Sequence, residues 1–240
     1  VWEFDRTYGE ADDSDLHITQ VELRGRQSAF EAIWNGVRVG RVELQIPGRH
    51  NVANAGAALA AGLSLGFAPA GLIDGLSQFT GTRRRFEPKG SVGRVRIFDD
   101  YAHHPTEITA TLRAAREVLA MEPDGRLVVV FQPHRYSRTA AFMDEFGAAL
   151  AVADEVVVME VYPAGEDPIP GAGGVSVAQA VHDHGLASVE FIASWSAVAP
   201  ALVDRIRPGD VVMTLGAGDV TLIGPEIIAG LNERETSELS

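Results

Sequence analysis

The chain has 240 residues, of which 46% are hydrophobic, with 25 glycines and no cysteine, so it is globular in composition and has no disulfide or thiolate metal site. The formal charge of −13 disfavours non-specific binding to nucleic acid, whose phosphates repel an acidic protein. No apolar run approaches the roughly 20 residues that cross a bilayer, and the first residues do not resemble a signal peptide, so we expect a cytoplasmic protein without a membrane or nucleic-acid partner.

The first part of the chain reads as antiparallel β structure followed by two helices. Apolar residues fall near alternation in residues 1–48, and residues 32–39 predict a hairpin with Asn35-Gly36 at its turn. The alanine-rich segment 50–65 and the segment 70–79 predict helices, which Gly66 and Pro69 interrupt.

From about residue 86 the pattern becomes a regular alternation of strand and helix. Short apolar runs predict strands at residues 92–98, 127–131, 156–159, 189–192 and 211–215. The segments between and after them predict helices at residues 105–119, 139–151, 176–184, 195–206 and 223–231, and the polar tail after Leu231 is expected to be irregular. Runs that are apolar on both faces indicate strands covered by helices on each side. The sequence therefore predicts an α/β domain with a parallel, doubly wound, Rossmann-like sheet.

Polar side chains gather directly after the predicted strands, where ligands bind in sheets of this kind. Residues 99–105 follow the first strand, 132–139 the second, 160–167 the third and 216–219 the last. The first two segments hold most of the groups that bind anions or hydroxyls. We expect these two turns to meet at one edge of the sheet and to hold a negatively charged substrate.

Each group also has a simpler interpretation. Asp99 and Asp100 could cap the following turn, and the adjacent His103 and His104 could be ordinary loop residues, since two neighbouring histidines without a third ligand are weak evidence for a metal. Arginines usually pair with surface acids. Here, however, Arg135 and Arg138 flank a strand-to-helix junction beside His134, where helix amides and the helix dipole also favour an anion.

Three further segments have a local and a ligand-binding interpretation. Asn51 and Asn54 lie one helical turn apart, so one could cap the helix or both could read a purine edge. The arginine run 83–85 could be solvated charge in a linker or a clamp for a nucleotide. Gly216-Ala217-Gly218 lacks the third glycine of a dinucleotide fingerprint and is interpreted as a tight turn.

Four segments, in this order, resemble the Mur ligases: residues 47–55, 81–86, 99–107 and 131–139. The resemblance covers nearly the whole chain, and the last two segments look particular to the branch of the family that adds L-alanine. It implies that residues 1–85 are the β-plus-helix end of a central P-loop ATPase domain. It also implies that residues 86–240 are the Rossmann-like carboxyl-terminal ligase domain.

The resemblance further implies an activity and roles for named residues. The activity is ATP-dependent joining of L-alanine to UDP-N-acetylmuramate through an acyl phosphate, with Mg²⁺, in peptidoglycan precursor synthesis. The implied nucleotide-binding residues are Asn51 and Asn54 at the adenine with His50 beside them, Arg85 at the ribose or phosphates, and Asp100 at the ribose hydroxyls. The implied residues for the muramyl or alanyl portion are Tyr101, His103, Arg135 and Arg138, with His134 as a neighbour.

The sequence also lacks parts that this activity needs. A P-loop requires a lysine in a glycine-rich context, and Lys89, the only lysine, has no such context. We therefore expect a fragment without ligase turnover, whose partners include the missing uridine-binding and ATPase parts of the same enzyme. Three alternatives stay open: another Mur or folylpolyglutamate-type amide ligase, a non-catalytic nucleotide-binding module, and a nicotinamide-dependent oxidoreductase. The last is disfavoured, because its glycine fingerprint should follow the first strand.

Overall fold

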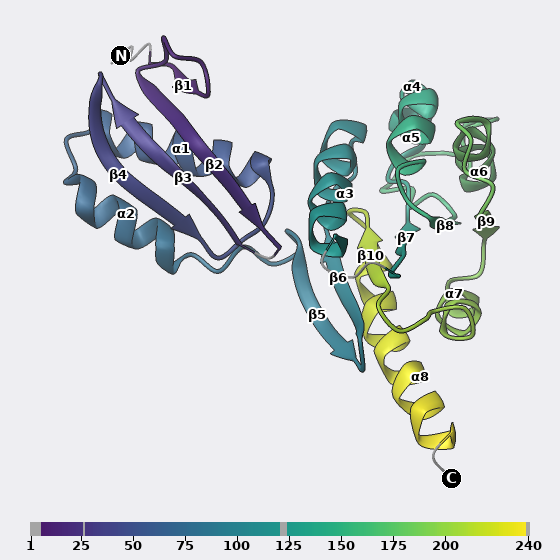
Figure 1. Cartoon of the computed structure of the whole chain (residues 1–240). Helices are drawn as coiled ribbons and strands as arrows, with labels where there is room; N and C mark the ends of the chain where they lie inside the picture. Colours follow the sequence, from purple (N-terminus) through teal and green to yellow (C-terminus); the bar gives the residue numbers. More distant parts are fainter. Residues whose placement is uncertain (1–5, 26, 121–123, 239–240) are drawn as a thin grey trace. The chain divides into compact units, whose positions relative to one another are not determined.

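The chain folds into two compact units, Val1–Gly81 and Thr82–Ser240, shown in a computed structural model that describes residues 6–25, 27–120 and 124–238 (Figure 1). The division falls after Gly81, and the domain boundary after residue 85 that the family resemblance implies stays a prediction. These are unit 1 and unit 2, respectively.

Unit 1 contains a four-stranded sheet in the order β1-β2-β3-β4. The strands are β1 (Tyr8–Gly9), β2 (Leu16–Arg24), β3 (Gln27–Trp34) and β4 (Val37–Leu44). Strands β2, β3 and β4 are antiparallel as predicted, whereas the short β1 runs parallel to β2, which the sequence did not indicate. The turn between β3 and β4 has positive φ at both Asn35 (47°) and Gly36 (79°), as the predicted Asn-Gly hairpin requires.

The two helices of unit 1 are α1 (Arg49–Ser64) and α2 (Pro69–Gln78), close to the predicted ranges. Pro69 occupies the first turn of α2, where its missing N–H costs no hydrogen bond. Val52 and Leu59 on α1 pack with sheet residues such as Leu16 and Phe30 in one apolar core. Burial of this core is the main source of stability for unit 1.

Unit 2 contains a six-stranded sheet in the order β5-β6-β10-β7-β8-β9. The strands are β5 (Glu87–Val92), β6 (Val95–Asp100), β7 (Leu127–Phe131), β8 (Glu155–Met159), β9 (Val189–Ile192) and β10 (Val211–Leu215). All except β5 are parallel, which confirms the predicted α/β class.

The first strand of unit 2 differs from the prediction. The predicted strand 92–98 is the end of β5 and most of β6, joined by a turn at Gly93 (φ 51°), and β5 runs antiparallel to β6 at the sheet edge. The sequence did not predict β5, because Pro88 and Gly90 both weaken a strand. An edge strand tolerates them, and the register of β5 shifts between these two residues.

The helices of unit 2 are α3 (Pro105–Leu119), α4 (Tyr136–Ala141), α5 (Met143–Leu150), α6 (Gly174–Asp183), α7 (Trp195–Val203) and α8 (Ile223–Glu238), with a 3₁₀ turn at Asp219–Leu222. The predicted helix 139–151 is two helices, α4 and α5, separated at Phe142. The prediction of an irregular tail after Leu231 was wrong within the described residues. Helix α8 continues to Glu238, and Arg234 fixes it by donating to the carbonyl oxygens of Val203 and Ile206. Across the described ranges, none of the helices combines the length and the apolar character of a membrane span.

The sheet of unit 2 is covered on both faces (Figure 1). Helices α3, α5 and α6 pack on one face, in a core that includes Val129 and Phe131 of β7. Helices α7 and α8 pack on the other face, in a core that includes Val128 and Val130 of the same strand. The doubly wound arrangement is therefore confirmed, and alternate residues of one strand serve opposite cores.

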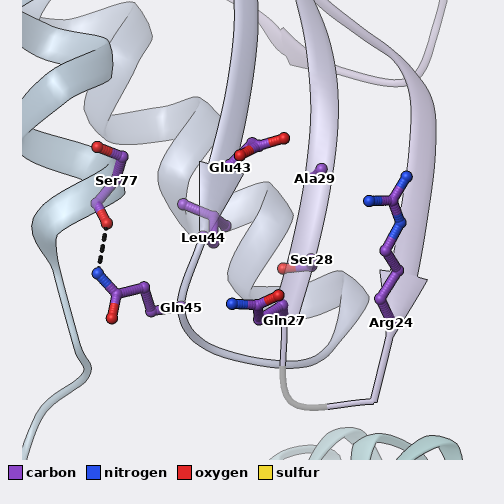
Figure 2. A pocket seen from close by; sticks show the side chains of 8 residues that line it. All are labelled: Arg24, Gln27, Ser28, Ala29, Glu43, Leu44, Gln45 and Ser77. Carbon is purple, nitrogen blue, oxygen red and sulfur yellow. Dashed lines mark hydrogen bonds between the residues drawn. The ribbon is translucent and has the colours of Figure 1, made fainter.

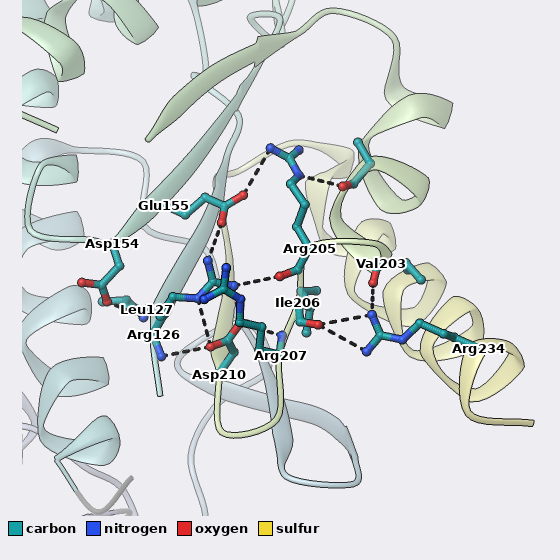
Figure 3. A network of polar contacts seen from close by, with 11 residues as sticks. Arg126, Leu127, Asp154, Glu155, Val203, Arg205, Ile206, Arg207, Asp210 and Arg234 are labelled. Carbon is teal, nitrogen blue, oxygen red and sulfur yellow. Dashed lines mark hydrogen bonds and ion pairs between the residues drawn. The ribbon is translucent and has the colours of Figure 1, made fainter. Parts of the chain in front are cut away.

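A polar network ties together the amino ends of the parallel strands (Figure 3). Asp210, which is fully buried, accepts hydrogen bonds from the Arg126 guanidinium (2.7 Å) and from the Arg207 amide (2.9 Å). Arg126 also pairs with the buried Glu155 at 3.0 Å, and Arg205 approaches the other oxygen of Glu155 at 3.3 Å. This edge is thus occupied by structural ion pairs, which leaves the opposite, carboxyl edge for ligands.

Candidate functional site

Three polar turns meet at the carboxyl edge of the sheet of unit 2. Leu215, the last residue of β10, pairs with Asp100 of β6 on one side and with Phe131 of β7 on the other. Strands β6 and β7 are therefore separated by β10. Their turns still meet, because the ring centroids of His103 and His134 are 6.0 Å apart. The two turns therefore meet as expected, and their binding of a negatively charged substrate stays a prediction.

Four aromatic rings form a continuous row along this edge, contributed by the turns after β6, β7 and β8. Tyr101 meets His103 edge to face at 5.2 Å, and His103 meets His134 in the same manner. His134 stacks on Tyr162 with ring centroids 5.5 Å apart and planes 5° from parallel. We call these four side chains the ring row. Tyr162 is a member that sequence reasoning did not single out.

The contacts of His103 fix which of its ring nitrogens carries a proton in the neutral form. Nδ1 lies 3.0 Å from the carbonyl oxygen of Tyr101 and 3.4 Å from Oε2 of Glu107, and both oxygens can only accept. Nδ1 must therefore be the donor, which leaves Nε2 with its lone pair. His103 consequently presents a hydrogen-bond acceptor and base. His104, in contrast, accepts from the Thr106 amide and forms a capping box with Glu107 at the start of α3.

His134 lies in a cationic and partly buried setting. Burial lowers the pKa of His134, and the nearby charges of Arg138, His103 and Arg135 lower it further. Its Nδ1 atom is buried without a hydrogen-bond partner among the described residues. A histidine whose pKa falls below the ordinary value of about 6.5 is neutral at physiological pH. His134 can thus contact a cationic or hydrogen-bond-donating group without repelling it.

Arg135 and Arg138 retain charge that no close ion pair neutralises. The Arg135 side chain is 51% exposed, and its guanidinium lies 3.8 Å from Oε1 of Glu166. Arg138 donates to the carbonyl oxygen of His134 at 3.2 Å and, within the described ranges, forms no ion pair. Two guanidiniums at the rim of the ring row provide the fork-shaped donors that bind carboxylate or phosphate.

The start of α4 is not available to an external anion, contrary to the prediction for this junction. Glu166 accepts a hydrogen bond from the Ser137 amide at 2.9 Å and one from the Ser137 hydroxyl at 2.7 Å. These two bonds, with the charge of Arg135, lower the pKa of Glu166. The carboxylate of the protein itself therefore occupies the place where the helix amides would hold a ligand. The contact spans 29 positions in the sequence, so only the fold reveals it.

The arginine run 83–85 contains one structural arginine, Arg84, and two exposed ones, Arg83 and Arg85. Arg84 lies with its Nε 3.1 Å from the fully buried carboxylate of Asp99, which also accepts from the hydroxyls of Thr214 and Thr221. Arg84 also donates to the carbonyl oxygen of Gly216 at 2.5 Å. The Arg85 side chain is 52% exposed, and its guanidinium lies 3.8 Å from Oε1 of Glu107. Arg85, like the exposed Arg83, is thus able to reach a ligand.

Asp100 is committed to the backbone. Its side chain is buried, with one oxygen accepting from the Phe86 amide at 2.8 Å and the other from the Ala102 amide at 2.7 Å. Burial raises the pKa of Asp100, against the effect of these hydrogen bonds. Both carboxylate oxygens thus hold the backbone of the turn around Tyr101. The contact of Asp100 with ribose hydroxyls stays a prediction.

The glycines after β10 are required by close packing. A Cβ atom on Gly218 would lie 2.4 Å from Oε1 of Gln132 and 2.9 Å from the ring of Tyr162. Gly216 has φ 142°, and a Cβ atom there would lie 2.6 Å from the carbonyl oxygen of Gln132. The turn packs between the segments after β7 and β8, in agreement with its interpretation as a tight turn.

In unit 1 the predicted nucleotide-binding residues lie in the first turns of α1. Asn51 donates its Nδ2 to the carbonyl oxygen of Pro47 at 2.7 Å, and Asn54 is exposed. Neither caps the helix, because the residue at the cap position is Gly48, with φ 98°. His50 is half-buried beside them. Asn51 keeps its side-chain oxygen for a ligand, and Asn54 offers both a donor and an acceptor.

Unit 1 also has a pocket of about 290 Å³ at one end of β3 and β4 (Figure 2). Its lining is mainly polar, and the Gln45 side chain donates to the carbonyl oxygen of Ser77 across it at 2.8 Å. None of the residues predicted for ligand binding contributes to this lining. Among residues 6–25, 27–120 and 124–238, no group of three or more acidic or histidine side chains could hold a metal ion.

Comparison with known proteins identifies the family of this chain. The family described as "Mur ligase, glutamate ligase domain" matches residues 84–218, more than half of the chain. The chain belongs to the Mur ligase family. This Mur ligase chain contains, within the matched range, the ring row, both arginines of the turn after β7, and the glycine turn after β10.

Individual relatives extend the match into unit 1. The chain is 52% identical over 230 residues to UDP-N-acetylmuramate–L-alanine ligase of Acidothermus cellulolyticus, covering 95% of this chain and 47% of the relative. It is 56% identical over 195 residues to the enzyme of the same name from Saccharopolyspora erythraea, covering 81% of this chain and 39% of that one. This Mur ligase chain therefore spans about half the length of the curated relatives it matches.

A solved structure agrees. The crystal structure of UDP-N-acetylmuramate–alanine ligase from Thermotoga maritima matches with a TM-score of 0.76 at 30% sequence identity. The match covers 98% of this Mur ligase chain and 48% of that protein. Both units therefore have a counterpart in one known ligase.

Proposed function

We propose that the complete protein joins L-alanine to UDP-N-acetylmuramate with ATP, and that this chain supplies the groups that hold the amino acid. The relatives named for that reaction support the proposal, as do the carboxyl-edge turns of unit 2. The observation that carries it is the meeting of the turn after β6 with the turn after β7, at His103 and His134. Two guanidiniums with little internal neutralisation lie at the same rim.

The chemistry of these groups suits an amino acid with a free carboxylate and a reacting amine. We propose that Arg135 and Arg138 bind the carboxylate, because guanidiniums form paired, charge-assisted hydrogen bonds with it. The Nε2 lone pair of His103 can accept a hydrogen bond, or a proton, from the amine before it attacks an activated carboxyl group. A neutral His134 beside it avoids repelling the amino group. Tyr101 and Tyr162 would border the small side chain at the two ends of the ring row.

Nucleotide binding is a separate proposal for each unit. In unit 1 we assign it to Asn51 and Asn54 with His50 nearby, since these amides still have free hydrogen-bonding capacity. In unit 2 we assign it to Arg85, whose guanidinium is exposed. Bound ATP would supply the phosphoryl group that activates the acid. The Mg²⁺ that the family resemblance implies has no candidate ligand set in the described ranges, so no step is assigned to it. The cytoplasmic location stays a prediction.

The test uses the complete protein. Phosphate release should require ATP, UDP-N-acetylmuramate and L-alanine together, and glycine or serine should compete poorly with alanine. The variant Arg138→Lys should raise the KM for alanine by about 10- to 100-fold, since a charge-assisted hydrogen bond contributes about 1.5–3 kcal/mol. The matched control is Arg113→Lys, an exposed arginine on α3.

Three outcomes would redirect the proposal. Phosphate release with a different amino acid would assign the chain to another amide ligase of the same architecture. Nucleotide binding without any phosphate release would favour a non-catalytic module. Turnover by the 240-residue chain alone would refute the expectation that this chain has no ligase activity by itself.

A further inference from the structure

The segment after β8 shapes the turn after β7, although sequence reasoning gave it no role. The Tyr162 amide donates to the carbonyl oxygen of Pro133 at 2.8 Å, and the Arg135 amide donates to the carbonyl oxygen of Tyr162 at 2.9 Å. These bonds extend the pairing of β7 with β8 by an isolated bridge between His134 and Tyr162. The turn after β7, which carries Arg135, is thus held in place by backbone hydrogen bonds to the segment after β8.

Glu166 adds a second attachment four residues further along this segment. Its two oxygens accept from the amide and the hydroxyl of Ser137, the second residue of α4, and its side chain is 26% exposed. A carboxylate in this position satisfies amides that would otherwise attract a free anion.

The same carboxylate orients Arg135. The Arg135 backbone has φ 74°, a left-handed conformation that is strained for a residue with a side chain and needs support from its surroundings. Oε1 of Glu166 lies 3.8 Å from the Arg135 guanidinium, which is close enough to attract it and too far to form a paired hydrogen bond. Arg135 is therefore directed by Glu166 and keeps its donors for a ligand.

We propose that Glu166 is a positioning residue for substrate binding: its carboxylate accepts the hydrogen bonds of Ser137 and orients Arg135. The substrate carboxylate is thereby directed to the guanidiniums of Arg135 and Arg138. This inference rests on the proposed function, because it assumes that these arginines hold the amino acid. Glu166 acts through Ser137 and Arg135 and does not itself contact the substrate.

The kinetic test uses the complete protein with Glu166→Gln. Glutamine has the same shape and can bond to Ser137 through its oxygen and its NH₂ group, so the variant removes the charge and keeps the fold. The KM for alanine should rise on the order of tenfold, as expected for the loss of one charge-assisted interaction, with kcat changed less than about threefold. Asp167→Asn is the matched control: it is the next residue, exposed, and loses the same charge. It should change KM less than about twofold.

A rescue experiment separates a role of the carboxylate from a role of the loop. Glu166→Ala should show a larger rise in KM than Glu166→Gln. Added formate should lower that KM again, because a small carboxylate can enter the vacated position at Ser137. A Glu166→Gln protein that matches Asp167→Asn in KM, or a Glu166→Ala protein that formate leaves unchanged, would overturn the proposal.

A measurement on the 240-residue chain distinguishes failure of this inference from failure of the proposed function. The titratable and charged groups that face His134 are Arg138, His103, Arg135 and Glu166, and Glu166 is the only one of these that raises the pKa of His134. Nuclear magnetic resonance should therefore show a lower pKa of His134 in Glu166→Gln and a shifted Ser137 amide, with neither change in Asp167→Asn. Unchanged signals would refute the positioning role. Changed signals without alanine-dependent turnover would instead refute the proposed substrate.

Discussion

Arg84 and Arg85 are adjacent arginines for which the structure predicts opposite effects on substitution. Arg84→Ala removes the cation that lies 3.1 Å from the fully buried Asp99, and it leaves the carbonyl oxygen of Gly216 without its donor. Arg85→Ala removes a side chain that is 52% exposed and whose guanidinium lies 3.8 Å from Glu107. The first variant should lose stability, and the second should lose nucleotide binding.

The magnitude follows from burial. Removing one partner of a buried ion pair costs about 3–5 kcal/mol, because the other charge is left uncompensated. The Arg84 side chain is 22% exposed and Asp99 is not exposed, so water screens the pair only partly, and we expect about 3 kcal/mol. For a domain of this size, 1 kcal/mol corresponds to about 2–4 °C in Tm, so the melting transition of unit 2 should fall by about 6–12 °C. Arg85→Ala should stay within about 0.5 kcal/mol of the wild type.

Urea and thermal unfolding of the 240-residue chain, followed by circular dichroism, measure both variants. A third protein tests the cause of the loss. Adding Asp99→Asn to Arg84→Ala removes the uncompensated carboxylate, so the double variant should be more stable than Arg84→Ala alone. Equal stability of Arg84→Ala and Arg85→Ala would refute the reasoning. It would also be refuted if the double variant lost as much stability as Arg84→Ala and Asp99→Asn lose separately, added together.

Three further outcomes follow from contacts described above. Because burial and the charges of Arg138, His103 and Arg135 lower the pKa of His134, its ring should titrate below the ordinary value of about 6.5 in proton resonance spectra. The contribution of neutral His134 to the free energy of unfolding is therefore present above about pH 6.5 and is lost as the pH falls toward the pKa of the folded state. The variant Arg138→Gln should raise the pKa of His134, because it removes a nearby positive charge. Gly218→Ala should cost about 1–3 kcal/mol in urea unfolding, since a Cβ atom would overlap the Gln132 and Tyr162 side chains. Asp210→Asn should cost about 3 kcal/mol, whereas the exposed Asp204→Asn should be neutral in the same measurement.

Local patterns were enough to predict most of the elements. The ranges of α3, β7, β9 and β10 match the prediction, because their apolar periodicity and flanking residues agree with their tertiary setting. The errors occur where tertiary contacts decide the structure. Strand β5 depends on pairing with β6, and the last turns of α8 depend on the contacts of Arg234 with the end of α7.

The candidate site likewise has parts that the sequence predicted and parts that it did not. The two turns that meet at His103 and His134 could be found from sequence, since polar groups directly after parallel strands gather at one edge. The position of β10 between β6 and β7 could not, because strand order leaves no local signal. Tyr162 and Glu166 were missed for a related reason. Their partners are in the preceding βα unit, and an isolated tyrosine or glutamate in a loop is usually solvated.

The two outermost strands of the large sheet bear on how this protein behaves in concentrated solution. On one side β5 carries Pro88, which has no N–H group, together with a register shift, and Gly90 of the same strand packs closely against Ile228 of α8. On the other side β9 is only four residues long. Neither strand offers the long, flat ladder of unpaired backbone groups on which a second molecule could add a strand. Self-association through the borders of this sheet is thus disfavoured, and unit 2 should be a suitable segment to study by itself.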